Sequence, residues 1–288
     1  MKIMRKSAAT ACAKQVTIFA VLTALVAPVP AFADLMLFPT RVVMEDGVRS
    51  AQVELVNRDT TPASYKINLI NRRMTETGEI VEAEDARPDE AFADKMVFFT
   101  PRLVTLQPGS SQIVRIAVRR PPGLASGEYR THLQFDRLPE MDSSNIEQLR
   151  QNSPGEAATF RLTALIGASI PVIVRQGATE ASVTIAALGL TTSPDKHEQA
   201  LTFEIRRSGN RSTYGDIVAT FEQPGTKPIT LGMAAGVAVY VPNPVRRSSL
   251  PLTVPPGLKL QHGQIVLRYQ ARSDEGGAIM AEEVLALP

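Results

Sequence analysis

Cysteine, tryptophan and histidine are nearly missing from this sequence. It holds one cysteine, no tryptophan and three histidines in 288 residues. Cys12 lies in a segment that we expect to be removed, which leaves the mature chain without disulfides, a cysteine nucleophile or a thiolate metal site. His132, His197 and His262 are scattered at expected loops or on the solvent face of an expected strand, not at metal-ligand spacing. We therefore expect no metal and no cofactor.

The sequence also lacks the motifs of common enzymes and an excess of one charge. No G-x-S-x-G, H-E-x-x-H or phosphate-binding glycine loop is present, so we expect no catalytic residues and no enzyme. The formal net charge is +2, and removal of the N-terminal segment, with four basic and no acidic residues, makes it −2. A nearly neutral chain gives no reason to expect a nucleic-acid partner. After the first 33 residues no apolar run is long enough to span a bilayer, so we expect no membrane insertion of the mature chain.

The first 33 residues have the pattern of a secretory signal peptide. A basic region precedes an apolar core over Val16–Val29, and Ala31–Ala33 is an A-x-A cleavage site. A membrane anchor is the alternative, but the apolar core is short for a span. Cleavage after Ala33 predicts an exported mature chain, Asp34–Pro288, of 288 − 33 = 255 residues.

Short runs of alternating apolar and polar residues predict β-strands throughout the mature chain. In the first half, Val114, Ile116 and Val118 alternate with polar neighbours, and Tyr129–Asp136 is the most regular run. The same pattern returns after an expected hinge at Gln176–Thr179, for example over Leu201–Arg206. Strands at this spacing, separated by turn residues, indicate antiparallel sandwiches with one solvent face per sheet. We expect an all-β chain with domains at 34–175 and 176–288.

One stretch, Phe160–Arg175, is unusually long and apolar for a strand. Its first part places Phe160, Leu162, Ala164 and Ile166 on one face. Pro171 cannot donate to a ladder, which places this end at a sheet edge, a bulge or a linker. Because a long apolar edge strand recruits other chains, we hypothesise that this strand is lent to a partner. An ordinary core strand is the alternative.

The order and spacing of several motifs resemble the periplasmic chaperones of the chaperone–usher pathway, which assemble pili and fimbriae. Leu37–Arg41 is similar to the first strand of that family. Phe99–Arg102 and Leu106–Gln112 resemble its proline-glycine turn into a basic strand, and Gly127–Arg130 resembles the strand before the donor strand. A weaker match is Arg207–Asn210 in the second domain.

The resemblance implies two tandem immunoglobulin-like β-sandwich domains set at an angle, with pilus subunits bound in and beside the cleft. It also implies that Phe160, Leu162, Ala164 and Ile166 fill the groove of a pilin-like subunit that lacks its last strand. Arg41 corresponds to the family's cleft arginine, which binds the subunit's C-terminal carboxylate; a solvated residue at a strand end is the alternative.

The sequence departs from the family at one position. The family usually pairs its cleft arginine with a lysine on the donor strand, and Pro171 stands there in this chain. Arg175, four positions on, is the nearest basic residue and is our candidate for a substitute anchor; Arg41 with backbone N–H groups is the alternative.

We therefore expect a non-enzymatic periplasmic chaperone that captures pilin-like subunits by donor-strand complementation and delivers them to an outer-membrane usher. Self-association of the free chain, which would hide the donor strand, stays open. Two other classes compete with this interpretation. One is a secreted immunoglobulin-like adhesion or binding module, and the other is a polysaccharide-active enzyme, which would need a pair of carboxylates in a cleft.

Overall fold

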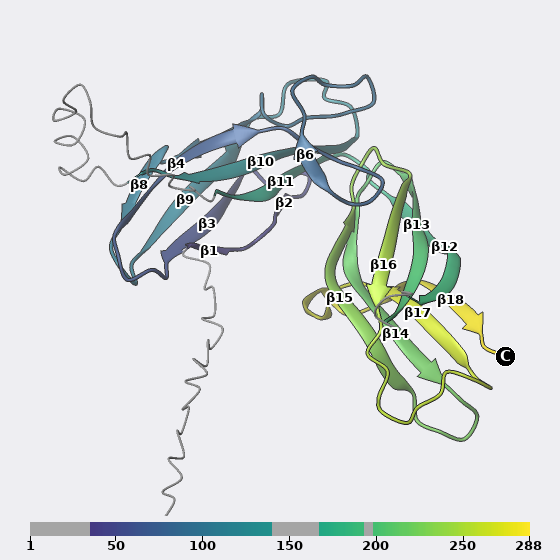
Figure 1. Cartoon of the computed structure of the whole chain (residues 1–288). Coiled ribbons are helices and arrows are strands. Elements are labelled where there is room, and N and C mark those ends of the chain that lie inside the picture. Colours follow the sequence, from purple (N-terminus) through teal and green to yellow (C-terminus); the bar gives the residue numbers. More distant parts are fainter. Residues whose placement is uncertain (1–34, 140–166, 193–197) are drawn as a thin grey trace, which may run out of the picture. The chain divides into compact units, whose positions relative to one another are not determined.

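The computed structural model describes residues 35–139, 167–192 and 198–288, and nearly all of its regular structure is β-strand (Figure 1). Four larger sheets form two sandwiches, as the alternating runs predicted. Within the described residues the helical structure is one 3₁₀ turn, η1 (Ser273–Glu275), and no helix there is long and apolar enough to cross a membrane. The angle between the two sandwiches stays a prediction.

The first sandwich packs a four-stranded sheet against a five-stranded one. The four-stranded sheet has the order β1 (Leu35–Phe38), β3 (Ser50–Asn57), β9 (Ser111–Val118), β7 (Val97–Thr100). The five-stranded sheet has the order β2 (Val42–Met44), β11 (Ala168–Gln176), β10 (Gly127–Arg137), β4 (Ala63–Ile70), β8 (Leu103–Leu106). A separate two-stranded hairpin consists of β5 (Arg72–Met74) and β6 (Ile80–Glu82).

The second sandwich has a three-stranded and a four-stranded sheet. The first has the order β12 (Ala181–Thr192), β13 (Gln199–Gly209), β16 (Val245–Pro251). The second has the order β15 (Ile229–Val239), β14 (Thr213–Glu222), β17 (Gln264–Gln270), β18 (Ile279–Ala286). Strand β16 lies inside a proline-rich stretch, so the sequence did not suggest a strand there. The strand can form because the prolines flank the paired residues or stand at the end of the strand.

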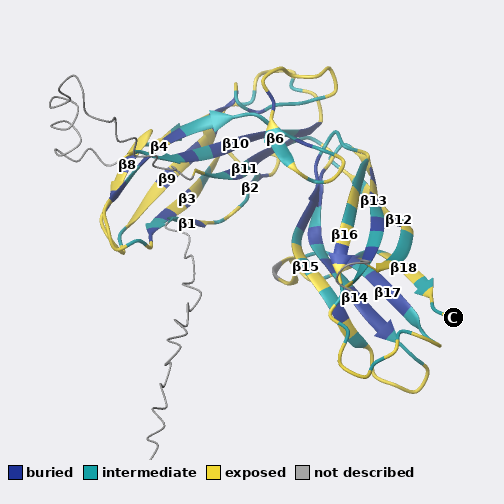
Figure 2. Cartoon of the chain, in the orientation of Figure 1, coloured by how far each residue is buried: buried dark blue, intermediate teal, exposed yellow. Residues whose placement is uncertain are grey.

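Each sandwich has its own apolar core, and the predicted period of two is visible in it. Val114, Ile116 and Val118 of β9 are buried, whereas the residues between them are exposed. Leu201, Phe203 and other residues of β13, β14 and β17 form the core of the second sandwich, which appears as the buried segments of these strands in Figure 2. Because alternate side chains of a strand face opposite sides, each sheet buries one face against its partner sheet.

The expectation of one solvent face per sheet is wrong at one end of β10. Arg130 and His132, expected on a solvent face, are buried, and so is the neighbouring Glu128. The outer face of the sheet is covered here by the second sandwich: Ile173 of β11 belongs to a cluster that includes Tyr240. Local alternation predicts that these polar residues face solvent. They lie instead at the junction of the two sandwiches, which the sequence pattern does not reveal.

Candidate functional site

Strand β11 is only half enclosed by its sheet. Its whole length pairs with β10, from Ala168 opposite Phe135 to Gln176 opposite Gly127. On the other side β2 runs parallel to it and pairs with Val172–Val174 alone. Among the described strands, none covers that side of Ala168–Pro171. Pro171 thus lies at a sheet edge, as its missing N–H predicted, and the backbone beside it can accept a further strand.

The predicted donor residues Phe160, Leu162, Ala164 and Ile166 lie outside the described residues. They precede β11 directly in the sequence. Within β11, Ile170, Val172 and Val174 are buried in the core of the first sandwich, and the alternate residues Pro171 and Ile173 occupy its other face. The last part of the apolar stretch therefore belongs to the chain's own core.

Arg41 lies in the link between β1 and β2 and points at two aromatic rings of the second sandwich. Its guanidinium carbon is 4.4 Å from the ring centroid of Tyr214 and 5.7 Å from that of Tyr240. The buried Nη1 atom of Arg41 has no hydrogen-bond partner. Stacking on ring faces holds the cation without using its donors, so those donors stay available for an anion.

A cavity of about 540 Å³ lies beside Arg41 and is lined by residues of both sandwiches. Its wall includes Arg41, Val43 and Glu45 from the β2 region, Arg175 from β11, and Tyr214 and Met280 from the second sandwich. The structure thus brings the two predicted anchor residues, Arg41 and Arg175, to the same cavity.

Arg175, unlike Arg41, already has its partners. Its side chain is 6% exposed, with Nη1 2.5 Å from Glu45 Oε1 and Nε 3.2 Å from Glu128 Oε2. The Glu128 carboxylate also accepts hydrogen bonds from the backbone N–H, at 3.2 Å, and the hydroxyl of Ser212. Arg175 and Glu128 therefore link strands of the first sandwich to the start of β14, and two of the three guanidinium nitrogens of Arg175 already bind carboxylates.

Sequence reasoning missed a buried polar group on the same face of the sheet. Arg130 and His132 of β10 are 6% and 3% exposed. Burial, together with the charges of Arg130 and Arg72, lowers the pKa of His132 to about 3, and burial also lowers the pKa of Arg130. The sequence shows these basic residues in the alternating run Tyr129–Asp136, but it does not show that they are buried. Tyr240, whose ring stacks on Arg130, is more than a hundred residues away in the sequence.

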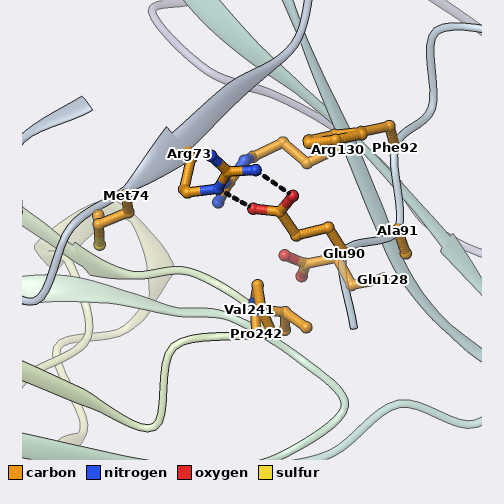
Figure 3. A pocket seen from close by; sticks show the side chains of 9 residues that line it. All are labelled: Arg73, Met74, Glu90, Ala91, Phe92, Glu128, Arg130, Val241 and Pro242. Carbon is orange, nitrogen blue, oxygen red and sulfur yellow. Dashed lines mark hydrogen bonds and ion pairs between the residues drawn. The ribbon is translucent and has the colours of Figure 1, made fainter. Parts of the chain in front are cut away.

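A much smaller cavity, of about 10 Å³, lies beside Arg130 (Figure 3). Across it Arg73 forms an ion pair with Glu90, whose Oε2 is 2.7 Å from Arg73 Nη2. The hydrogen bond from Arg73 lowers the pKa of Glu90. Because Arg73 and Glu90 are hydrogen-bond partners of each other, we assign this cavity to the structural junction between the sandwiches.

The hairpin β5–β6 provides further contacts between the sandwiches. The Asn243 side chain donates to the carbonyl oxygens of Met74, at 2.9 Å, and Thr75, at 3.3 Å. Arg247 forms an ion pair with Glu76 and donates its backbone N–H to the Glu76 carbonyl. Among the described residues, no group of three or more histidines, cysteines or carboxylates is arranged to hold a metal ion.

A family profile decides the assignment of the chain. The profile described as "Pili and flagellar-assembly chaperone, PapD N-terminal domain" matches residues 34–177, which is half of the 288 residues. The chain belongs to this family. It is a non-enzymatic pilus-assembly chaperone of the chaperone–usher pathway, and chaperones of this family are periplasmic.

Solved chaperone structures are similar to this chaperone at low identity. The YadV chaperone is 15% identical, with 88% of this chain and 100% of that chain covered and a TM-score of 0.44. The CupB2 chaperone of Pseudomonas aeruginosa is 11% identical, with 88% and 100% covered and a TM-score of 0.42. A Salmonella enterica structure of the SafA pilin in complex with the SafB chaperone matches at 16% identity, with 88% and 96% covered and a TM-score of 0.39. No curated protein matches the chain.

Proposed function

We propose that this chaperone captures pilin-like subunits by donor-strand complementation and delivers them to an outer-membrane usher. The observation that carries the proposal is the open side of β11 at Ala168–Pro171, next to the apolar stretch that precedes it. A strand with one unpaired side can join two sheets, its own and that of a guest. The side chains at Phe160, Leu162, Ala164 and Ile166 are the proposed donors.

Apolar burial supplies most of the proposed affinity. Phe160, Leu162 and Ile166 each contribute roughly 1.5–3 kcal/mol when fully buried in an apolar groove. The small Ala164 adds little and suits a shallow part of the groove. A shift of one residue would turn every donor away from the groove, so the register of the guest strand needs a polar anchor.

Arg41 is the proposed anchor for the C-terminal carboxylate of the subunit. It lines the 540 Å³ cavity and keeps a buried donor, Nη1, without a partner. A hydrogen bond between charged groups contributes about 1.5–3 kcal/mol, and a guanidinium can hold a carboxylate with two parallel bonds. Arg175 lies on the same wall, but its ion pairs with Glu45 and Glu128 argue against direct contact with the carboxylate.

The N-terminal segment suits this function. A signal peptide cleaved after Ala33 would deliver the chaperone to the periplasm, where subunits emerge and the usher is accessible. In the proposed cycle, release follows when the extension of the next subunit replaces the donor strand.

A pull-down tests the proposal. The mature chain, tagged at its C-terminus, is recovered from the periplasm of its own organism, and the retained proteins are identified by mass spectrometry. We expect a subunit with an incomplete immunoglobulin-like fold, at one copy per chaperone. A surface ligand in place of a subunit would favour the adhesion module, and recovery of the chain with copies of itself alone would contradict capture.

A further inference from the structure

The side chain of Arg41 lies against an aromatic ring of the second sandwich. Its guanidinium carbon is 4.4 Å from the centroid of the Tyr214 ring, within the distance at which a cation and an aromatic face attract each other. The Tyr240 ring is farther away, at 5.7 Å, and has Arg130 at 4.0 Å. A second arginine near Tyr214, Arg272, is 5.9 Å from that ring. Arg41 thus has Tyr214 as its nearer ring, and Tyr214 has Arg41 as its nearer cation.

Within the described residues, only these ring contacts fix the guanidinium of Arg41. It forms no ion pair there, and its buried Nη1 atom has no hydrogen-bond partner. An arginine side chain loses much rotamer freedom when it is ordered. Arg41 also stands in the link between β1 and β2, outside the paired residues of both strands. Its orientation therefore depends on the ring it stacks on.

The position of the Tyr214 ring is itself fixed by β15. Tyr214 is paired with Ala238 of that strand, and its side chain packs against the cluster that includes Tyr240. The hydroxyl oxygen of Tyr214 lies close to Gly236: a Cβ atom at that position would be 3.0 Å from the oxygen. Gly236 also has a φ of +68°, a conformation that favours glycine. The absence of a side chain at Gly236 therefore leaves room for the tyrosine ring.

Acidic side chains do not compete with the ring for Arg41. Two carboxylates line the same cavity, those of Glu45 and Glu275. Glu45 Oε1 lies 2.5 Å from Nη1 of Arg175, and within the described residues neither acid forms an ion pair with Arg41. A carboxylate partner would neutralise Arg41 and occupy its donors. An aromatic ring orients the cation and leaves both its charge and its N–H groups available.

We propose that Tyr214 is a positioning residue for the subunit anchor, because its ring holds the charged guanidinium of Arg41 at the wall of the 540 Å³ cavity. The inference rests on the proposed function, in which Arg41 binds the C-terminal carboxylate of a subunit. The second sandwich thereby takes part in subunit binding through the face of an aromatic ring. Ordering Arg41 before the subunit arrives removes part of the entropy that binding would otherwise lose.

Arginine NMR on the mature chain tests the positioning without a subunit. A spectrum of Arg41→Lys assigns the Nε–H signal of Arg41 by its disappearance. Because protons above an aromatic ring move upfield, we expect an upfield Arg41 signal in wild type and in Tyr214→Phe, which keeps the ring. In Tyr214→Leu the signal should return to the ordinary arginine range. An unshifted signal in wild type, or one that Tyr214→Leu does not move, would overturn the proposal.

Two further variants make the NMR test specific. Phe98→Leu is the matched control, because it removes the ring that lies 5.2 Å from the guanidinium carbon of Arg119 on the first sandwich. It should leave the Arg41 signal where it is in wild type. Tyr214→Met keeps an apolar side chain without a ring and should behave like Tyr214→Leu, which keeps the test decisive if the leucine variant does not fold. Circular dichroism checks the fold of each variant.

Subunit affinity gives a readout that a merely structural role would not produce. Tyr214→Leu should weaken subunit binding about twofold to thirtyfold, the range of one cation–π interaction, and Tyr214→Phe should bind like wild type. In the Arg41→Ala background, Tyr214→Leu should have no further effect, because the ring acts through Arg41 alone. An equal loss in both backgrounds would mean that Tyr214 contacts the subunit itself or supports the fold, and would overturn the proposal.

The same measurements separate this proposal from the proposed function. Wild-type affinity in Tyr214→Leu, together with weaker binding by Arg41→Ala, rejects the role of Tyr214 and leaves Arg41 as the anchor. A wild-type chain that retains no subunit rejects the proposed function. In that case an Arg41 signal that depends on the Tyr214 ring still supports the positioning of Arg41, and a signal that does not depend on it rejects the positioning as well.

Discussion

The Glu128 carboxylate lies 3.2 Å from the Nε atom of Arg175, and the two side chains are only 1% and 6% exposed. They stand opposite each other on neighbouring strands, β10 and β11. Ser212, at the end of the second sandwich where β14 begins, also donates to Glu128. This pair therefore belongs to the structure of the junction, whereas the open edge of β11 and Arg41 are the parts proposed to meet a subunit.

Glu128→Gln tests the structural role of this pair. It should lower the free energy of unfolding by about 3–5 kcal/mol, because it leaves Arg175 buried with one carboxylate partner fewer. Urea unfolding followed by circular dichroism measures the change. Glu282→Gln is the control, because Glu282 pairs with Arg268 at an exposed position, with 41% of its side chain accessible. It should change stability by about 1 kcal/mol at most. Equal effects of the two substitutions would contradict the structural role.

Ile166→Asp tests the donor strand. It should abolish subunit capture and leave the melting temperature unchanged, because a charge in an apolar groove is strongly disfavoured. Co-purification of the subunit with the tagged chaperone is the measurement. Thr163→Asp, which lies on the opposite face of the predicted strand, is the control and should retain the subunit. Capture at the wild-type level by Ile166→Asp would remove this residue from the donor set.

Arg41→Ala tests the anchor. It should weaken subunit binding about tenfold to a hundredfold, which is the loss of one charge-assisted hydrogen bond of about 1.5–3 kcal/mol. The melting temperature should stay the same, since Arg41 has no ion pair in the described structure. Titration calorimetry with the purified subunit measures the affinity. Arg102→Ala, which removes an exposed arginine near Phe99, should leave the affinity unchanged, and an unaltered affinity in Arg41→Ala would exclude Arg41 from the site.

The stability of the chaperone should depend on pH through His132. Its pKa is lowered from 6.5 to about 3 in the folded chain, so the folded state binds fewer protons than the unfolded state between these values. The contribution of His132 is therefore fully present above pH 6.5 and is lost as the pH falls toward 3. Urea midpoints measured from pH 7.5 to pH 4.5 should fall less steeply in His132→Gln than in wild type. His262→Asn, at an exposed turn, is the control, and parallel curves for wild type and His132→Gln would show that His132 does not cause the slope.

Local patterns determined the strands and their inward faces. Val114, Ile116 and Val118 lie in the core as their alternation predicted, because in a strand the side-chain period alone selects the face. Pro171 likewise lies at a sheet edge, because a residue without an N–H cannot serve a second neighbour. The resemblance to pilus chaperones, carried by short motifs in a fixed order, also needed no coordinates.

Only the tertiary structure decided which polar residues are buried and which arginines form ion pairs. The resemblance makes Arg41 the cleft arginine and Arg175 a candidate substitute for the missing lysine. In the structure Glu45 and Glu128 pair with Arg175, whereas Arg41 meets two tyrosine rings. Arg130 and His132 follow the pattern of a solvent face, yet both are buried, and Tyr240 of the second sandwich stacks on Arg130. Burial and charge pairing depend on residues far away in the chain, such as Ser212 and Tyr240, and local periodicity carries no information about such contacts.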